Sequence, residues 1–229
     1  MIKYCLKMFI AISTTLFLSE VVAADTPEPA SRCQSCHQLE QSAATAVLDP
    51  QTRKAPPLYF AGNKFRRAWL LEWLQAPTRI RPAGAFYANH IATVNDEDLI
   101  DDASLTPHLS VDSAQAEVIT DWLMTLTPNN ELIAAEAGYT PGKVSPRLGA
   151  MDFVKFKGCG GCHRDTPEYG GLSGPELYTA WQRLQPGYIV SYMRNPAAWD
   201  RQSTMPNRAM GDTQIHKLTD YLKTLSGED

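Results

Sequence analysis

Two five-residue stretches of this chain have the residue types and spacing to do chemistry: Cys33-Gln34-Ser35-Cys36-His37 and Cys159-Gly160-Gly161-Cys162-His163. The pattern C-x-x-C-H is the attachment signature of a c-type haem. Two thiols one short turn apart can reach the two vinyl groups of one porphyrin, and the adjacent histidine is then held below the iron as an axial ligand. The sequence therefore predicts two haem c groups, bound covalently through Cys33, Cys36, Cys159 and Cys162, with His37 and His163 on the irons.

Three other uses of paired cysteines compete with this interpretation. Two C-x-x-C pairs can form a zinc site, but zinc requires no histidine directly after each pair, and the pairs lie far apart in the chain. A thioredoxin-like redox motif is expected near a βαβ pattern, and none is present. Structural disulfides are possible in an exported protein. The paired histidines favour haem over all three.

The first 24 residues have the pattern of a secretory signal peptide. Lys3 and Lys7 form its charged start, residues 8–18 its apolar run, and a small-residue cleavage site ends at Ala24. The apolar run is shorter than the about 20 residues that a membrane span needs. We expect export to the periplasm, removal of the signal near Ala24, and no transmembrane segment in the mature chain.

The mature chain is expected to be acidic. Removal of Lys3, Lys7 and Glu20 with the signal, together with Cys5, leaves 19 basic and 24 acidic residues, a formal charge of −5. This charge argues against nucleic acid and against an anionic membrane surface as partners. The remaining length, about 205 residues, suits two small domains, each with a modest core of its own.

The apolar spacing predicts helices in both halves of the chain. A lead at residues 25–31 is too short and too interrupted by proline for a packed helix, and residues 127–144 are rich in turn formers and are expected to be a linker with one helical turn. Residues 78–110 are expected to be irregular. The expected helices are residues 64–75, 112–126, 145–158, 188–193 and 212–225.

The two halves repeat each other. Residues 115–126 and 214–225 both follow Q-x-x-x-[IL]-T-D-[WY]-L-x-T-L. The run Ala55-Pro56-Pro57-Leu58 is matched by Gly174-Pro175-Glu176-Leu177, and each is followed by a helix that a proline closes. The chain is therefore an internal duplication.

With these landmarks the chain resembles a diheme member of the class I cytochrome c family. The shared pieces are the C-x-x-C-H motifs, the [GA]-P-x-L loops, the helices closed by Pro77 or Pro196, a Met-Pro pair, and the terminal helices with Trp122 or Tyr221. The resemblance implies an all-α fold of two tandem cytochrome c-like domains, residues 25–126 and 145–229, each a few short helices around one haem. It also implies that Pro56 and Pro175 orient the proximal histidines through backbone carbonyls.

The resemblance places Met205 as the distal ligand of the second haem. Met205 lies nine residues after Pro196, is followed by Pro206, and precedes the last helix. Met/His ligation is typical of such haems. Met210 is the close rival.

The first domain departs from the family pattern, because it lacks an N-terminal helix before its motif and has no methionine at the corresponding position. About 20 residues are inserted there relative to the second domain. Among the ligands that haem iron accepts, His90 in this insertion is favoured as the distal ligand, over His108 and Met124. An open or water-bound iron also remains possible.

The sequence predicts a periplasmic electron-transfer protein, either a carrier or the cytochrome subunit of a larger oxidoreductase, and not an enzyme. Its expected partners are redox proteins, and an acidic run at residues 96–102 is either a solvated loop or a docking patch for a basic partner. One alternative is a diheme enzyme acting on peroxide or a sulfur compound at an open first haem. A third is a sensor that binds a diatomic gas there.

Overall fold

The computed structural model describes residues 26–41 and 50–228, so the predicted signal segment with Cys5 and Ala24 lies outside the described residues. Within them the chain is mostly helical, with one two-stranded antiparallel sheet. No helix in these ranges is long and apolar enough to cross a membrane. The prediction of helices is therefore confirmed, but the prediction of an all-α fold is wrong, because the structure also contains a small sheet.

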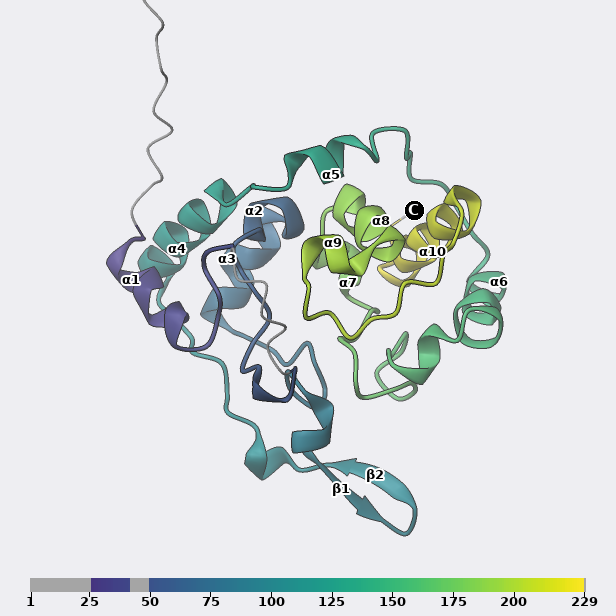
Figure 1. Cartoon of the computed structure of the whole chain (residues 1–229), viewed down its shortest axis with the longest axis horizontal. Helices are drawn as coiled ribbons and strands as arrows, with labels where there is room; N and C mark the ends of the chain where they lie inside the picture. Colours follow the sequence, from purple (N-terminus) through teal and green to yellow (C-terminus); the bar gives the residue numbers. More distant parts are fainter. Residues whose placement is uncertain (1–25, 42–49, 229) are drawn as a thin grey trace, which may run out of the picture.

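The two repeats lie side by side, and α5 (Asn130–Ala134) runs between them along one edge (Figure 1). The first repeat contains α1 (Glu28–Ser31), η1 (Arg32–Ser35), η2 (Pro50–Thr52), α2 (Ala61–Lys64), α3 (Arg67–Gln75), η3 (Tyr87–Asn89), β1 (Ile91–Val94), β2 (Glu97–Ile100), η4 (Asp102–Ser104) and α4 (Ser113–Thr125). The second contains α6 (Pro146–Met151), the π-turn η5 (Asp152–Phe156), η6 (Cys159–Gly161), α7 (Ala180–Arg183), α8 (Pro186–Arg194), α9 (Pro196–Trp199) and α10 (Asp212–Leu225).

The duplication is confirmed in the order and the bounds of the elements. Helices α2 and α7 begin and end at matching positions of the aligned repeats, and so do α3 and α8. The last helix of each repeat follows the shared sequence pattern. Helix α4 begins after Asp112, whose carboxylate accepts a bond of 2.8 Å from the amide of Gln115. This cap satisfies one of the amides that a helix start leaves unpaired.

Two expectations about the helices of the first repeat are wrong. The lead forms the one-turn helix α1, and its Ala30 is fully buried in the core. Proline in a first turn is tolerated because the first amides have no partner within the helix. The helix expected over residues 64–75 is broken at Phe65, which is extended because it forms a backbone bridge with Leu184 of the other repeat.

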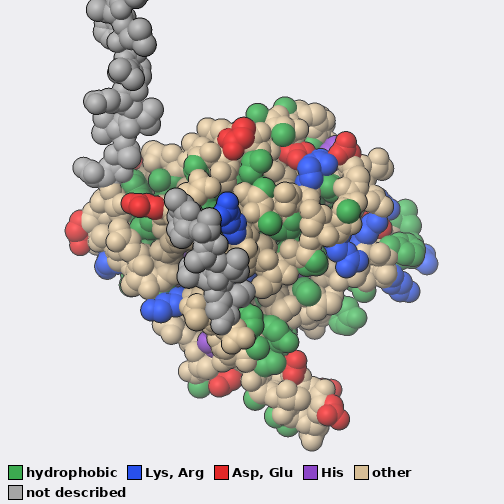
Figure 2. Space-filling view, in the orientation of Figure 1, with side chains coloured by type: hydrophobic (Ala, Val, Ile, Leu, Met, Phe, Trp, Pro, Cys, Tyr) green, Lys and Arg blue, Asp and Glu red, His purple; other side chains and the backbone are tan. Residues whose placement is uncertain are grey.

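The stretch expected to be irregular contains the hairpin β1–β2. Ile91 pairs with Ile100 and Val94 with Glu97, around a turn in which Asn95 and Asp96 both have positive φ, 54° and 65°. A two-residue turn of this kind matches the twist of the strands. The hairpin extends away from the helices in Figure 1, and Figure 2 shows acidic side chains gathered at its tip.

The repeats meet along a seam of matched backbone bonds. The amide of Arg66 donates to the carbonyl of Arg183, and the amide of Gln185 donates to the carbonyl of Lys64, each at 2.9 Å. Arg66 is the counterpart of Gln185, and Lys64 the counterpart of Arg183. We call this strip, residues 64–66 with 183–185, the seam.

The larger hydrophobic core is shared between the repeats, whereas each was expected to have a core of its own. It includes Phe60, Leu70 and Leu123 from the first repeat, and Tyr188 and Trp199 from the second. A smaller cluster around Phe153, Leu218 and Tyr221 belongs to the second repeat alone. A periodic pattern marks a face as apolar but does not say which other face covers it.

The predicted linker is packed on the structure. Its Glu136 is buried and accepts two bonds from the guanidinium of Arg194 on α8, at 2.7 and 2.8 Å. Asn130 accepts a bond of 2.7 Å from the amide side chain of Asn63 in α2. The linker is therefore bonded to both repeats.

Candidate functional site

The two C-x-x-C-H motifs fold into the same backbone turn. In the first, the amides of Cys36 and His37 both donate to the carbonyl of Cys33, at 3.2 and 2.8 Å. The second motif repeats both bonds at its own positions, at 3.1 and 3.0 Å. All four thiols are free. Each turn thus holds two cysteines and a histidine together, which is what attachment of one porphyrin requires.

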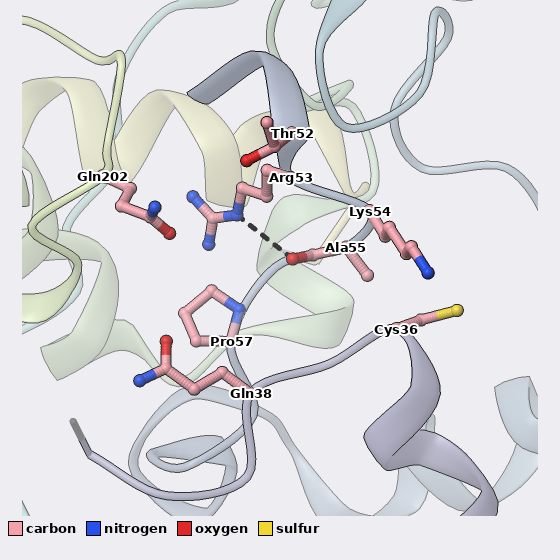
Figure 3. A pocket seen from close by; sticks show the side chains of 8 residues that line it. All are labelled: Cys36, Gln38, Thr52, Arg53, Lys54, Ala55, Pro57 and Gln202. Atoms are coloured by element: carbon pink, nitrogen blue, oxygen red, sulfur yellow. Dashed lines mark hydrogen bonds between the residues drawn. The ribbon is translucent and has the colours of Figure 1, made fainter. Parts of the chain in front are cut away.

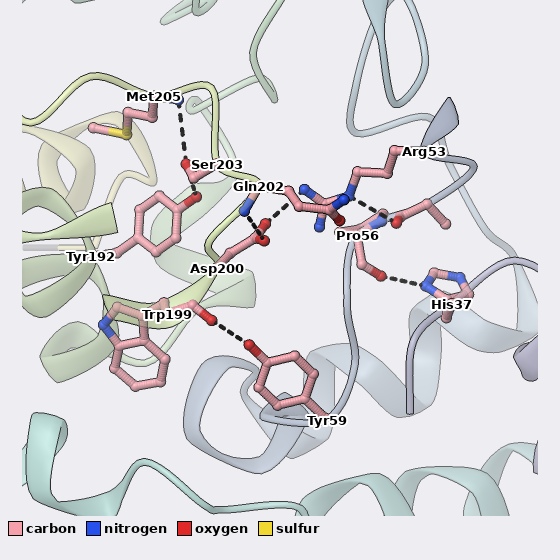
Figure 4. A network of polar contacts seen from close by, with 11 residues as sticks. His37, Arg53, Pro56, Tyr59, Tyr192, Trp199, Asp200, Gln202, Ser203 and Met205 are labelled. Carbon is pink, nitrogen blue, oxygen red and sulfur yellow. Dashed lines mark hydrogen bonds and ion pairs between the residues drawn. The ribbon is translucent and has the colours of Figure 1, made fainter. Parts of the chain in front are cut away.

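Each motif histidine is oriented by a proline carbonyl. Nδ1 of His37 donates to the carbonyl of Pro56 at 2.7 Å (Figure 4). Nδ1 of His163 donates to the carbonyl of Pro175, also at 2.7 Å. These expected contacts are confirmed. Because a carbonyl only accepts, the proton must lie on Nδ1, and Nε2 of each neutral ring keeps a free lone pair.

Burial keeps both imidazoles neutral. It lowers the pKa of His37 to about 4, although the bond to Pro56 acts in the opposite direction. Burial likewise lowers the pKa of His163. Close packing fixes the second ring further, because a Cβ at Gly174 would lie 2.5 Å from the imidazole of His163. Both Nε2 atoms are therefore available as metal ligands at neutral pH.

A single large cavity of about 880 Å³ connects the two motifs. This volume lies within the range of cofactor sites, about 300–1,000 Å³. A smaller pocket of about 270 Å³ lies beside Cys36, Arg53 and Pro57 (Figure 3). The predicted site residues that line the large cavity are Cys33, His37 and His108 from the first repeat, and Cys159, Cys162, His163 and Met205 from the second.

Positive charge gathers in the wall of the large cavity at and beside the seam. Arg183 is buried and forms an ion pair of 3.3 Å with Glu176. Lys64 and Arg81 also line the cavity, but neither has an ion-pair partner among the described side chains. Burial, then the charges of Arg81 and Arg183, lowers the pKa of Lys64 to about 7.

A cation removed from water is costly unless an anion compensates it. The two carboxylates of a haem would supply that compensation beside Lys64 and Arg81. The histidine turns and the unpaired cations therefore both fit the group that the motifs imply.

Met205 lines the cavity together with His163, as a distal ligand of the second haem must. Its amide donates to Oγ of Ser203 at 3.3 Å, and that hydroxyl lies 2.8 Å from the hydroxyl of Tyr192 (Figure 4). Met210 packs instead against the smaller core cluster and is not part of the cavity wall. The placement favours Met205 over Met210.

The three candidates for the distal ligand of the first repeat, His90, His108 and Met124, lie in different surroundings. His90 does not line the cavity, and its Nδ1 bonds to Oγ of Ser104 at 2.8 Å. Met124 does not line it either. His108 does, and its ring lies 6.1 Å from that of His37, centre to centre.

The zinc alternative finds no support in the side-chain arrangement. Within residues 26–41 and 50–228, no three His, Cys, Asp or Glu side chains come together in a way that could hold a metal ion. The two cysteine pairs therefore do not form one four-ligand zinc site.

Comparison with known proteins gives no match: no family model, curated protein or solved structure is similar to this chain.

Proposed function

We propose that this chain is an exported diheme c-type cytochrome that transfers electrons between redox proteins of the periplasm, as a carrier or as a subunit of a larger oxidoreductase. One observation carries the proposal. Both C-x-x-C-H motifs adopt the same turn, and in both the histidine Nδ1 donates to a proline carbonyl at 2.7 Å. A disulfide pair would give no reason for this repeated histidine geometry, and the two motifs do not come together as one four-ligand zinc site within the described residues.

A haem bound at each motif supplies an iron that accepts and releases one electron. His37 and His163 present Nε2 to that iron, and the bonds to Pro56 and Pro175 hold each ring in one tautomer and orientation. Met205 supplies a thioether in the second repeat. Residues of the apolar core shared by the repeats, among them Leu70, Leu123 and Ile189, line the cavity.

The cationic wall has a separate role in this proposal. Lys64 and Arg81 offset the negative charge that the cofactor carboxylates bring into the interior. They also favour the reduced state of a nearby iron, because reduction removes one positive charge from the site.

Intact mass after acid-acetone extraction tests the proposal. The mature chain should carry the added mass of two haem groups, which survive extraction because they are covalent. The double variant Cys33→Ala/Cys36→Ala should retain one haem, and so should Cys159→Ala/Cys162→Ala. A mass equal to that of the bare chain, or binding of zinc in place of haem, would overturn the proposal.

A further inference from the structure

Two histidines of the first repeat face the same cavity with their coordinating nitrogens free. Nδ1 of His37 donates to the carbonyl of Pro56 at 2.7 Å, and Nδ1 of His108 donates to the carbonyl of Leu109 at 2.8 Å. Because both acceptors are carbonyls, Nδ1 carries the proton in each ring, and each Nε2 keeps its lone pair. Each of the two rings is thus held by its own carbonyl in the tautomer that a metal ligand needs.

The separation of the two rings matches one metal ion held between them. Their centres lie 6.1 Å apart and their planes are inclined by 63°. Two imidazoles bound through nitrogen on opposite sides of one ion have centres roughly 6 Å apart, given metal–nitrogen distances of about 2.0–2.1 Å. The separation of the ring centres is therefore the one that two imidazoles on a single ion would have.

An aromatic row holds His108 in this position. The His108 ring lies 4.5 Å from the ring of Trp73, which stacks on Trp69 at 5.5 Å, which in turn stacks on Phe65 at 5.6 Å. Phe65 belongs to the seam, where it pairs with Leu184. His108 is exposed, yet its ring packs at the end of an aromatic row that begins at Phe65 in the seam.

His90 has a different environment. Its Nδ1 bonds to Oγ of Ser104, and its carbonyl accepts from the amide of Asp101 at 2.9 Å. A Cβ at Gly84 would lie 2.8 Å from its ring, so His90 packs tightly inside the inserted segment. These contacts assign it to holding the base of the hairpin.

We propose that His108, and not His90, is the second axial ligand of the first haem, opposite His37. The inference rests on the proposed function, because it concerns a ligand to the haem at the first motif. It makes that iron six-coordinate with two imidazoles, which excludes the open first haem that a peroxidase-like enzyme or a gas sensor would need.

The experiment measures CO binding to the purified, reduced holoprotein, and His108→Ala and His90→Ala are the matched pair of variants. The wild-type protein and His90→Ala should bind essentially no CO, whereas His108→Ala should bind one CO per chain. His108→Met should close the iron again and add a second thioether–iron charge-transfer band in the ferric spectrum. Unchanged far-UV circular dichroism and an unchanged Met205 band would show that the fold is intact.

The inference is overturned if His108→Ala stays closed to CO, if His90→Ala opens the iron, or if the wild-type protein already binds one CO per chain. Loss of the proposed function would be seen separately, as a mass without two haem groups in the wild-type protein.

Discussion

Arg53 and Asp200 form an ion pair of 2.7 Å between the segment that precedes Pro56 and the segment that precedes Met205, and both side chains are only 13% exposed. Arg53 also donates through Nε to the carbonyl of Ala55 at 3.1 Å, and Asp200 accepts from the amide of Gln202 at 3.0 Å. Figure 4 shows this pair between the two ligand-bearing segments. The pair therefore couples the loop that orients His37 to the loop that carries Met205.

Asp200→Asn should destabilise the protein by about 3 kcal/mol or more, because it leaves a mostly buried guanidinium without its counter-charge. Urea unfolding measures this loss. Asp121→Asn is the control. Asp121 pairs with Arg67, but the Asp121 side chain is 60% exposed, so this substitution should cost less than about 1 kcal/mol. Equal losses in the two variants would contradict a structural role for the buried pair.

Met205→Ala should abolish the thioether–iron charge-transfer band of the ferric protein, because Met205 lines the cavity with His163. Thioether ligation favours ferrous iron, so the higher of two redox waves should fall, by on the order of a tenth of a volt or more. Spectroelectrochemical titration measures both effects. In Met210→Ala the band and the wave should remain, and a loss of the band in that variant alone would identify Met210 as the ligand.

Reduction should be coupled to a proton on Lys64. Its pKa, about 7 in the folded chain against an ordinary value of 10.5, is low enough for its charge to be lost within the working range of pH. Below the pKa the charge favours the reduced state, and above it the charge is gone, so the potential should fall as pH rises. Cofactor carboxylates bound beside Lys64 would move this pH window upward.

Lys64→Met removes the titrating group and leaves a chain of similar length in the same apolar surroundings. The reduction potential of this variant should lie on the order of tens of millivolts below that of the wild-type protein at pH 6. The difference between the two potentials should become smaller toward pH 10. Titrations at both pH values measure it. A gap that is constant with pH would assign the coupled proton to another group.

Neutralising the hairpin tip should slow encounter with a basic redox partner. Asp96 and Glu97 are exposed at that tip, and Asp96→Asn/Glu97→Gln keeps the side-chain size and the positive φ that Asn tolerates at position 96. The association rate should fall about tenfold at low salt and little at high salt. Stopped-flow electron exchange with a basic cytochrome measures it. Glu131→Gln, on α5, is the control, and an equal effect there would exclude a specific patch.

The parts of the fold that local chemistry determines were predictable from the sequence. The last helix begins at Asp212 and ends at Leu225 as expected, because its apolar period and flanking glycines are local signals. The contacts of His37 and His163 with proline carbonyls were also expected, because the resemblance to the class I cytochrome c family implies them. Sequence alone could not show the break at Phe65, since that residue is extended through pairing with Leu184, far away in the chain.

The proposal of His108 in place of His90 depends on a fold that counting along the chain could not show. The inserted residues fold partly into a hairpin, which brings the chain back on itself between Ile91 and Ile100. Distance along the sequence then says little about distance to His37. The turn at Asn95 and Asp96 contains no glycine, so the strongest short hairpin signal was missing.

The contacts of the seam have the symmetry expected between two copies of a chain that contains a single repeat. Phe65 pairs with Leu184, its own counterpart, and the two bonds beside that pair link Arg66 to Arg183 and Gln185 to Lys64. In an isologous contact, residue i of one copy contacts residue j of the other, and residue j of the first copy contacts residue i of the second. Two-fold symmetry produces this relationship. A chain of one repeat could therefore make the same contact with a second copy of itself. The two repeats are thus arranged as the subunits of a homodimer would be, but within one polypeptide, and this lets each repeat carry its own residues, His108 in the first and Met205 in the second.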